Sequence, residues 1–453
     1  MTQLSFHGGA DVVTGANYLL EEEGSRVLVD CGMFQGTSWC EEENHKEFSY
    51  DPSSIDAVYI THAHIDHVGR LPKLVKEGFR GPIYSTAPTK DLTALILEDS
   101  EGILKEEAKE KGISPLTTRR DRELTLRQWE TVPFEKPLRT KGFEATFQSA
   151  GHILGSAFLT ISTNGGKRIA FSGDLGNEPN AMLKERAPLP PADYLLLECV
   201  YGGRNQEESS ERREALENII EETADRGGTL LLPAFAMERT QELLYDINEL
   251  AENGRIPKIP VYVDSPLAIA LTAVYKKYAR NKEYFRGEAV SEMERESVFD
   301  FPGLNLTETR KESLRINRDS SPKIIIAGSG MSQGGRILFH EQRYLRDPKS
   351  TLLFVGYQAK GSRGKALQQG AETVEIFGER VPVRCRVLTL EGYSAHADQD
   401  QLLGWTSSAR HQLKRVFLVQ GEHEQAELLA QKIRDLLAVK THIPELEEKV
   451  ELE

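Results

Sequence analysis

The chain has 453 residues, and 56 Lys+Arg against 70 Asp+Glu give it a net charge of −14 at pH 7. This length is sufficient for two or three domains with cores of their own. A charge of this sign excludes a protein that coats nucleic acid over a broad basic surface, and 39% hydrophobic residues exclude a wholly disordered chain.

Three features of the sequence bear on the cellular compartment, and the first is the cysteine pattern. Cys31, Cys40, Cys199 and Cys385 are scattered without a CxxC pair, which indicates a reducing compartment. No apolar run approaches the ~20 residues that span a bilayer, and residues 1–10 lack the basic and apolar regions of a signal peptide. We therefore expect a cytoplasmic protein with no membrane partner.

The first 200 residues are predicted to be rich in β-strands. Two hairpins are expected, over residues 17–30 and 156–173, where apolar and β-branched runs flank turn-forming residues. Between them, residues 55–61 are predicted to form a strand that ends in a His-rich loop. A helix is predicted to follow over 69–77.

From about residue 201 the pattern changes to strands that alternate with helices. A helix is predicted from Ser209 or Ser210 to Asp225. Alternation of this kind predicts a largely parallel sheet covered by helices. Strands are expected over 229–236, 259–264, 323–327, 351–356, 384–390 and 415–420.

The most informative local motif is Thr61-His62-Ala63-His64-Ile65-Asp66-His67. Three imidazoles and a carboxylate in so short a stretch are costly to bury unless each side chain has a partner. On a loop after a strand, His62 and His64 can point one way while Asp66 and His67 point another. Two zinc ions could then be bound side by side. A polar surface loop is the alternative interpretation.

One loop cannot fill the coordination of two ions, so further ligands are expected at other strand ends. Polar residues follow apolar strands in Gln148-Ser149-Ala150-Gly151-His152, Phe171-Ser172-Gly173-Asp174 and Val419-Gln420-Gly421-Glu422-His423. Glycine in each stretch permits close approach of the backbone. Asp174 has two oxygens and could bridge both ions.

These motifs resemble those of a known family. THAHIDHVG, AGHILGS, SGDLGN and GEHE are similar to the metal-binding motifs of the metallo-β-lactamase fold. LLLECVYGGR, GYSAHAD and GEHEQ are similar to the three further motifs of its β-CASP branch. That branch includes RNase J, the nuclease subunit of the cleavage and polyadenylation specificity factor, and DNA-repair nucleases. The resemblance extends over nearly the whole chain.

The resemblance implies a fold of the α/β class. An αββα metallo-β-lactamase domain is expected from residues 1–200 and 371–453, with an α/β β-CASP domain over residues 201–370 inserted into it. It also implies two Zn²⁺ per chain. The first ion is expected at His62, His64, His152 and Asp174, and the second at Asp66, His67, Asp174 and His423.

Catalytic and substrate-binding residues are implied as well. His396 matches the catalytic histidine of the family, Glu198 would hold it in its working tautomer, and Asp30 matches a residue that orients a ligand histidine. Asp66 is likewise expected to be a catalytic residue. Contacts with substrate are expected at glycine-rich turns and beside His396, at Ser329, Gly330, Met331, Lys360, Arg363 and Ser394. Solvated loop tips are the alternative.

In this family a histidine in the third motif marks RNA-directed members, so His423 favours RNA. The implied reaction is hydrolysis of RNA phosphodiester bonds to 5′-phosphate and 3′-hydroxyl ends. Endonucleolytic cleavage of single-stranded RNA is expected, and 5′-to-3′ exonuclease activity and a homodimer are left open. Two other functions are left open too: a zinc hydrolase of thioesters or lactones, and a non-catalytic scaffold in RNA processing.

Overall fold

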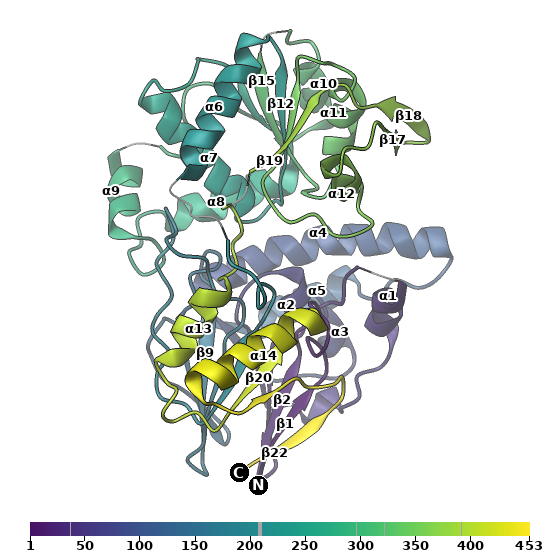
Figure 1. The fold of residues 1–453 in the computed structure, drawn as a ribbon. Helices are drawn as coiled ribbons and strands as arrows, with labels where there is room; N and C mark the ends of the chain where they lie inside the picture. Colours follow the sequence, from purple (N-terminus) through teal and green to yellow (C-terminus); the bar gives the residue numbers. More distant parts are fainter. Residues whose placement is uncertain (37, 207–210, 296, 321, 391) are drawn as a thin grey trace. The chain divides into compact units, whose positions relative to one another are not determined.

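The computed structural model describes the chain except residues 37, 207–210, 296, 321 and 391, which also places the helix start predicted at Ser209 or Ser210 outside the described residues. The chain divides into two units (Figure 1). The first unit is Met1–Asn205 with His396–Glu453, and the second is Gln206–Ala395.

The first unit contains two seven-stranded sheets. The first sheet, in spatial order, consists of β22 (Lys449–Leu452), β1 (Thr2–Phe6), β2 (Tyr18–Glu22), β3 (Ser25–Val29), β4 (Ala57–Tyr59), β5 (Ile83–Ser85) and β6 (Trp129–Thr131). The second consists of β21 (Thr441–His442), β20 (Arg415–Val419), β11 (Tyr194–Glu198), β10 (Arg168–Phe171), β9 (Ala157–Thr163), β8 (Phe143–Ser149) and β7 (Leu138–Thr140). Both predicted hairpins are confirmed, as β2–β3 and β9–β10.

The two sheets pack face to face. Phe6 of the first sheet lies with its ring centroid 5.5 Å from that of Phe417 in the second, and Tyr18 lies 6.3 Å from Phe171. Helices cover the outer faces: α2 (Ile65–Val68), α3 (Leu71–Lys76) and α4 (Ala87–Lys111) on one side, α13 (Gln399–Ser407) and α14 (His423–Leu437) on the other. The unit is completed by α1 (Ser38–His45), η1 (Pro52–Ser54) and α5 (Arg119–Arg127). The predicted αββα architecture is confirmed.

The helix predicted over 69–77 is confirmed as α3, which begins at Leu71 and ends at Lys76. A separate short helix, α2, precedes it and ends at Val68, within the stretch predicted to be a His-rich loop. Pro72 stands in the first turn of α3, where its missing N–H and fixed φ are tolerated, whereas inside a continuous helix they would break the hydrogen-bond ladder. The early start of α2 places Asp66 and His67 on a helix.

The second unit contains the predicted parallel sheet. Every strand pair in it is parallel, in the order β14 (Leu304–Leu306), β13 (Val261–Val263), β15 (Lys323–Ala327), β12 (Thr229–Pro233), β16 (Thr351–Phe354) and β19 (Arg386–Thr389). Its helices are α6 (Arg212–Asp225), α7 (Arg239–Glu252), α8 (Pro266–Tyr278), α9 (Gly287–Arg295), α10 (Arg310–Ile316), α11 (Ile337–Tyr344) and α12 (Arg363–Gln368). A small hairpin of β17 (Thr373–Ile376) and β18 (Glu379–Pro382) joins them.

The return to the first unit lies at residue 396 rather than at the expected 371. The reason is strand pairing, because β19 pairs in parallel with β16 along residues 386–389 and therefore extends the sheet of the second unit. Within the described ranges, no helix combines the length and the apolar character needed to cross a membrane.

Candidate metal centre

Four of the predicted metal ligands converge in the first unit. His62 and His64 follow β4, His152 follows β8, and Asp174 follows β10. One nitrogen of each imidazole and one Asp174 oxygen all lie within 4.8 Å of one another. Loops at the ends of strands from both sheets thus bring together residues that are more than a hundred positions apart in the sequence.

Neighbouring donor atoms of this group lie at distances usual for ligands of one zinc ion. His62 Nε2 lies 3.0 Å from His64 Nδ1 and 3.3 Å from Asp174 Oδ2. His152 Nε2 lies 3.3 Å from His64 Nδ1 and 3.4 Å from Asp174 Oδ2. Ligand atoms about 2.0–2.1 Å from a tetrahedral zinc are separated by about 3.3 Å. The four side chains are therefore close enough together to bind a single ion.

Burial gives these imidazoles the protonation state that a metal needs. Desolvation, reinforced by neighbouring imidazoles, lowers the pKa of His64 and of His152 well below the ordinary value. Only the neutral imidazole has a lone pair for a metal ion, so the two side chains can bind zinc without first losing a proton.

Asp30 lies against His67, as its match to an orienting residue implies. It directly follows β3, and its Oδ2 lies 2.8 Å from His67 Nδ1. Thr61 donates to the same carboxylate through its backbone N–H and its hydroxyl, both at 2.8 Å. Because Asp30 accepts at Nδ1, the other nitrogen of His67, Nε2, faces Asp174 Oδ1 at 3.3 Å. Asp66 precedes His67 in α2, and desolvation raises the pKa of its carboxyl.

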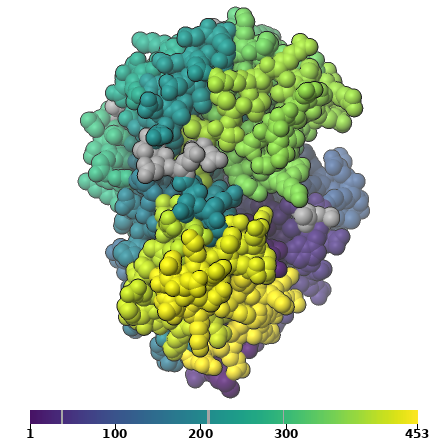
Figure 2. Space-filling view, viewed as in Figure 1, coloured from purple at the N-terminus to yellow at the C-terminus, as the bar shows by residue number. Residues whose placement is uncertain are grey.

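The structure does not bring His423 into this cluster. His423 is the first residue of α14, its side chain is 59% exposed, and its Nδ1 lies 2.7 Å from Asp11 Oδ1. That contact raises its pKa, as expected of a surface ion pair. The helix α14 lies on the outer surface of the first unit, in the yellow region of Figure 2. The second ion therefore lacks the histidine that the resemblance assigned to it.

Gln420 lies in the cluster instead. It directly follows β20, is 2% exposed, and its Nε2 lies 2.8 Å from His67 Nε2 and 2.9 Å from Asp174 Oδ1. His423 was assigned to the second ion because the resemblance carried the family's ligand histidine over to the histidine of GEHE. Position within the motif was the better signal, since Asp30 and Gln420 are each the first residue after a buried strand.

His396 and Glu198 form a second pair beside the metal ligands. Glu198 ends β11 and is fully buried, and its Oε1 lies 3.3 Å from His396 Nδ1 and accepts from the Leu175 N–H at 2.8 Å. The His396 ring lies 4.6 Å from the His152 ring. Burial disfavours the charged form of His396, but the Glu198 carboxylate outweighs it and raises the pKa of His396 to about 9. The Glu198 carboxylate thus favours the protonated form of His396 beside these ligands.

The six residues expected to contact substrate all belong to the second unit. Several of them form hydrogen bonds that stabilise loops of that unit. Ser329 Oγ accepts from the Gln333 and Gly334 N–H groups at 3.1 and 3.2 Å, and the backbone of Met331 accepts from Gly364 at 3.1 Å. The Arg363 guanidinium donates to the carbonyls of Ser332 and Glu375. Arg363 therefore has a structural role, whereas Lys360 is exposed.

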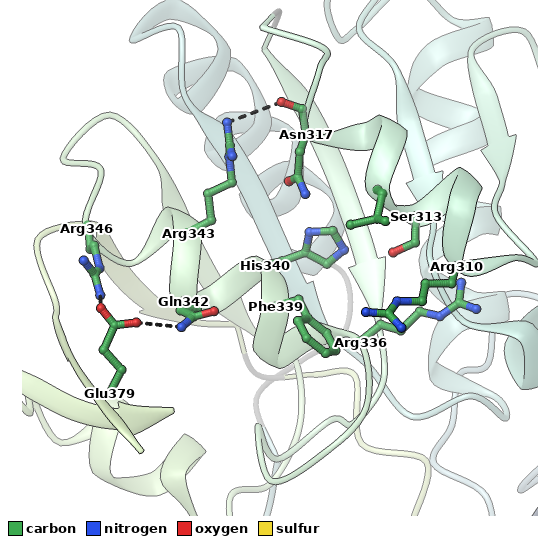
Figure 3. Close-up of a pocket in the computed structure, with 11 residues that line it drawn as sticks. Arg310, Ser313, Asn317, Arg336, Phe339, His340, Gln342, Arg343, Arg346 and Glu379 are labelled. Atoms are coloured by element: carbon green, nitrogen blue, oxygen red, sulfur yellow. Dashed lines mark hydrogen bonds and ion pairs between the residues drawn. The ribbon is translucent and has the colours of Figure 1, made fainter. Parts of the chain in front are cut away.

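The second unit contains a pocket of about 830 Å³ (Figure 3). None of the expected substrate contacts is among the residues described as lining it. Two of its arginines are paired, Arg336 with Asp264 at 2.7 Å and Arg346 with Glu379 at 2.6 Å. The remaining lining residues are Arg310, Ser313, Leu314, Asn317, Phe339, His340, Gln342 and Arg343.

Asp264 connects this pocket to the sheet, and its replacement by alanine is expected to destabilise the second unit by about 3–5 kcal/mol. The fully buried carboxylate binds Arg336, His340, Ser313 and Thr307, all at 2.7 Å. Burial would raise the pKa of Asp264, but these hydrogen bonds outweigh it and lower the pKa. Its contribution is therefore present at neutral pH and lost as pH falls through the acid range.

Hydrogen exchange of β13 and β15 measures this effect locally. Ser313→Ala is the matched control, because it removes one of these hydrogen bonds and is expected to cost about 1 kcal/mol. Equal exchange in wild type and Asp264→Ala would contradict the assignment.

Comparison with known proteins agrees with this geometry. Residues 10–217 match the family described as Metallo-beta-lactamase superfamily, residues 240–367 match the Beta-Casp domain, and residues 380–444 match the Zn-dependent metallo-hydrolase RNA specificity domain. The three matches follow one another along most of the chain.

Curated relatives cover nearly the whole chain. It is 41% identical over 419 residues to Ribonuclease TTHA0252 of Thermus thermophilus, covering 92% of each protein. It is 31% identical over 456 residues to the RNase J-like protein of Methanocaldococcus jannaschii, covering 98% of each. It is also 31% identical over 464 residues to the transcription termination factor FttA of that organism, covering 98% of this chain and 70% of the factor. The chain belongs to the β-CASP family of the metallo-β-lactamase superfamily.

Proposed function

We propose that this protein is a zinc-dependent ribonuclease that hydrolyses phosphodiester bonds of single-stranded RNA. One arrangement carries the proposal: the clustered donors of His62, His64, His152 and Asp174 beside the His396–Glu198 pair. The ribonuclease relatives and the match to an RNA specificity domain support RNA as the substrate. His423, being exposed, does not contribute to this assignment.

We propose a separate role in the reaction for each group of residues in the site. The four ligands would hold the ion, and an ion that keeps a position open for water would supply a Lewis acid and a nucleophilic water at neutral pH. Glu198 fixes His396 Nδ1, so the proton at His396 Nε2 is the one available to the 3′-oxygen that leaves. Protonation of that oxygen gives a 3′-hydroxyl end, and the attacking water gives a 5′-phosphate. The buried Glu198 carboxylate keeps this imidazole charged until the proton is transferred.

The test uses three substrates with purified protein: linear single-stranded RNA, the same RNA circularised, and a thioester. We expect cleavage of both RNAs to 5′-phosphate ends, lost with a chelator and regained with zinc. Cleavage of the circle identifies endonuclease action, and comparison of 5′-phosphate with 5′-hydroxyl linear RNA identifies 5′-to-3′ exonuclease action. Turnover of the thioester without RNA cleavage would reject the proposal, and zinc-free protein inert toward all substrates would favour a scaffold.

A further inference from the structure

Gln420 occupies the place between the two side chains on which a second metal ion would depend. Its carboxamide nitrogen lies 2.8 Å from His67 Nε2 and 2.9 Å from Asp174 Oδ1. Those two acceptor atoms lie 3.3 Å apart, which is also the separation of two ligands on one tetrahedral zinc ion, about 3.3 Å. The amide nitrogen thus lies beside two atoms, His67 Nε2 and Asp174 Oδ1, that could both be ligands of one second ion.

The hydrogen bonds around Gln420 are consistent with each other. In the neutral ring that donates its Nδ1–H to Asp30, at 2.8 Å, His67 Nε2 is an acceptor. The amide has two N–H groups, and one goes to this lone pair while the other goes to the Asp174 carboxylate. The Tyr18 hydroxyl lies 3.5 Å from the amide oxygen on the opposite side. Both amide hydrogens therefore point at the atoms that a second cation would have to bind.

Zinc in proteins is bound by thiolate sulfur, imidazole nitrogen or carboxylate oxygen, and the nitrogen of an amide has no lone pair to offer. For an ion to enter, the buried amide would have to leave two hydrogen bonds, and breaking hydrogen bonds of a buried group is costly. It would also contribute no negative charge to the site. The residues at this position, His67, Asp174 and Gln420, therefore do not fit a second ion of affinity comparable to the first.

We propose that the chain binds one zinc ion tightly, at His62, His64, His152 and Asp174, and that Gln420 closes the second position. This inference rests on the proposed function, because the first ion is the one that the reaction uses. It corrects the two ions per chain that the family resemblance implies. His423 does not restore the second position, since its two nitrogens contact Asp11 and Glu427 on the surface at 2.7 and 3.4 Å.

The backbone at residue 420 permits a direct test. Gln420 has φ of +53° and its N–H donates to the Gly9 carbonyl at 2.7 Å. Histidine is among the residues that tolerate this left-handed conformation, and its volume is close to that of glutamine. Gln420→His is therefore expected to fold and to place an imidazole beside His67 and Asp174, which together with Asp66 would complete a second ligand set.

The measurement is the zinc content per chain after dialysis, for wild type, Gln420→His, Gln420→Leu and His423→Ala. We expect one equivalent in wild type, Gln420→Leu and His423→Ala, and two in Gln420→His. Replacing zinc by cobalt gives an independent spectrum, in which Gln420→His should double the visible absorption. The wild-type stoichiometry is decisive even if a variant does not fold.

Parallel RNA cleavage assays separate this inference from the proposed function. Two equivalents in active wild-type protein, with one lost in His423→Ala, would overturn the single-ion inference and leave the ribonuclease intact. One equivalent without RNA cleavage would overturn the proposed function and leave the metal count standing. Wild-type protein that takes up no zinc would overturn both.

Discussion

Replacement of His396 by alanine is expected to lower kcat for RNA cleavage by about 10²–10⁴-fold, the range for loss of a positioned general acid. KM is expected to change little, since the imidazolium acts on the leaving oxygen as the bond breaks. Zinc content should stay at the wild-type value, because the ion is held by other side chains. Single-turnover cleavage of labelled RNA gives the rate, and metal analysis of the same sample gives the zinc content.

The pH dependence of the cleavage rate tests whether His396 donates the proton to the leaving oxygen. A general acid works in its protonated form, so the wild-type rate should fall as pH rises through the His396 pKa of about 9. Glu198 raises that pKa, so Glu198→Gln should move the fall to lower pH, which a purely structural role would not do. His411→Ala, at an exposed histidine of the same unit, is the control. Full activity of His396→Ala would refute its role.

Replacement of Asp174 by alanine is expected to abolish both zinc binding and RNA cleavage. This carboxylate contacts His62, His152 and His67 at 3.3–3.4 Å, so its removal takes a ligand from the first ion and leaves three buried imidazoles facing one another. Loss of an outer partner of a metal ligand already costs about 10–100-fold in affinity. Loss of the ligand itself should exceed this, and activity should fall with occupancy.

Titration with zinc under a competing chelator measures the affinity of the Asp174 variant. Asp435→Asn, at an exposed carboxylate on α14, should bind zinc as wild type does. If Asp174→Ala retained a full equivalent of zinc at wild-type affinity, the ligand set assigned here would be wrong. Partial rescue of cleavage at high zinc would indicate that affinity, rather than geometry, is what the carboxylate supplies.

The convergence of His62, His64, His152 and Asp174 was predictable because each follows a strand within a few residues. The ends of neighbouring strands lie at one edge of a sheet, so short loops leave these side chains little freedom. Gln420 was missed because the resemblance was matched to the histidine of GEHE and not to the first residue after the strand. The beginning of α14 at His423 turns that side chain outward, and no periodicity fixes a helix start so closely.

The end of the inserted unit was predicted too early for a different reason. Residues 384–390 have the apolar pattern of any buried strand, and nothing in their composition changes at residue 370 or 396. Only hydrogen bonding assigns β19, through its parallel pairing with β16, to the second unit. Pairing between distant segments is a property of three-dimensional packing, which local pattern does not encode.

The antiparallel pairing of β1 with β22 has a consequence for the order in which the protein is made. Residues 206–395 are synthesised before His396, so the second unit can begin to fold while the first is still incomplete. During that interval the outer edge of β1 has no partner, and unpaired strand edges are prone to join other chains. Synthesis of the last strand therefore protects a sheet begun at the first residues, and His396 and Gln420 reach the metal ligands in the same final stage.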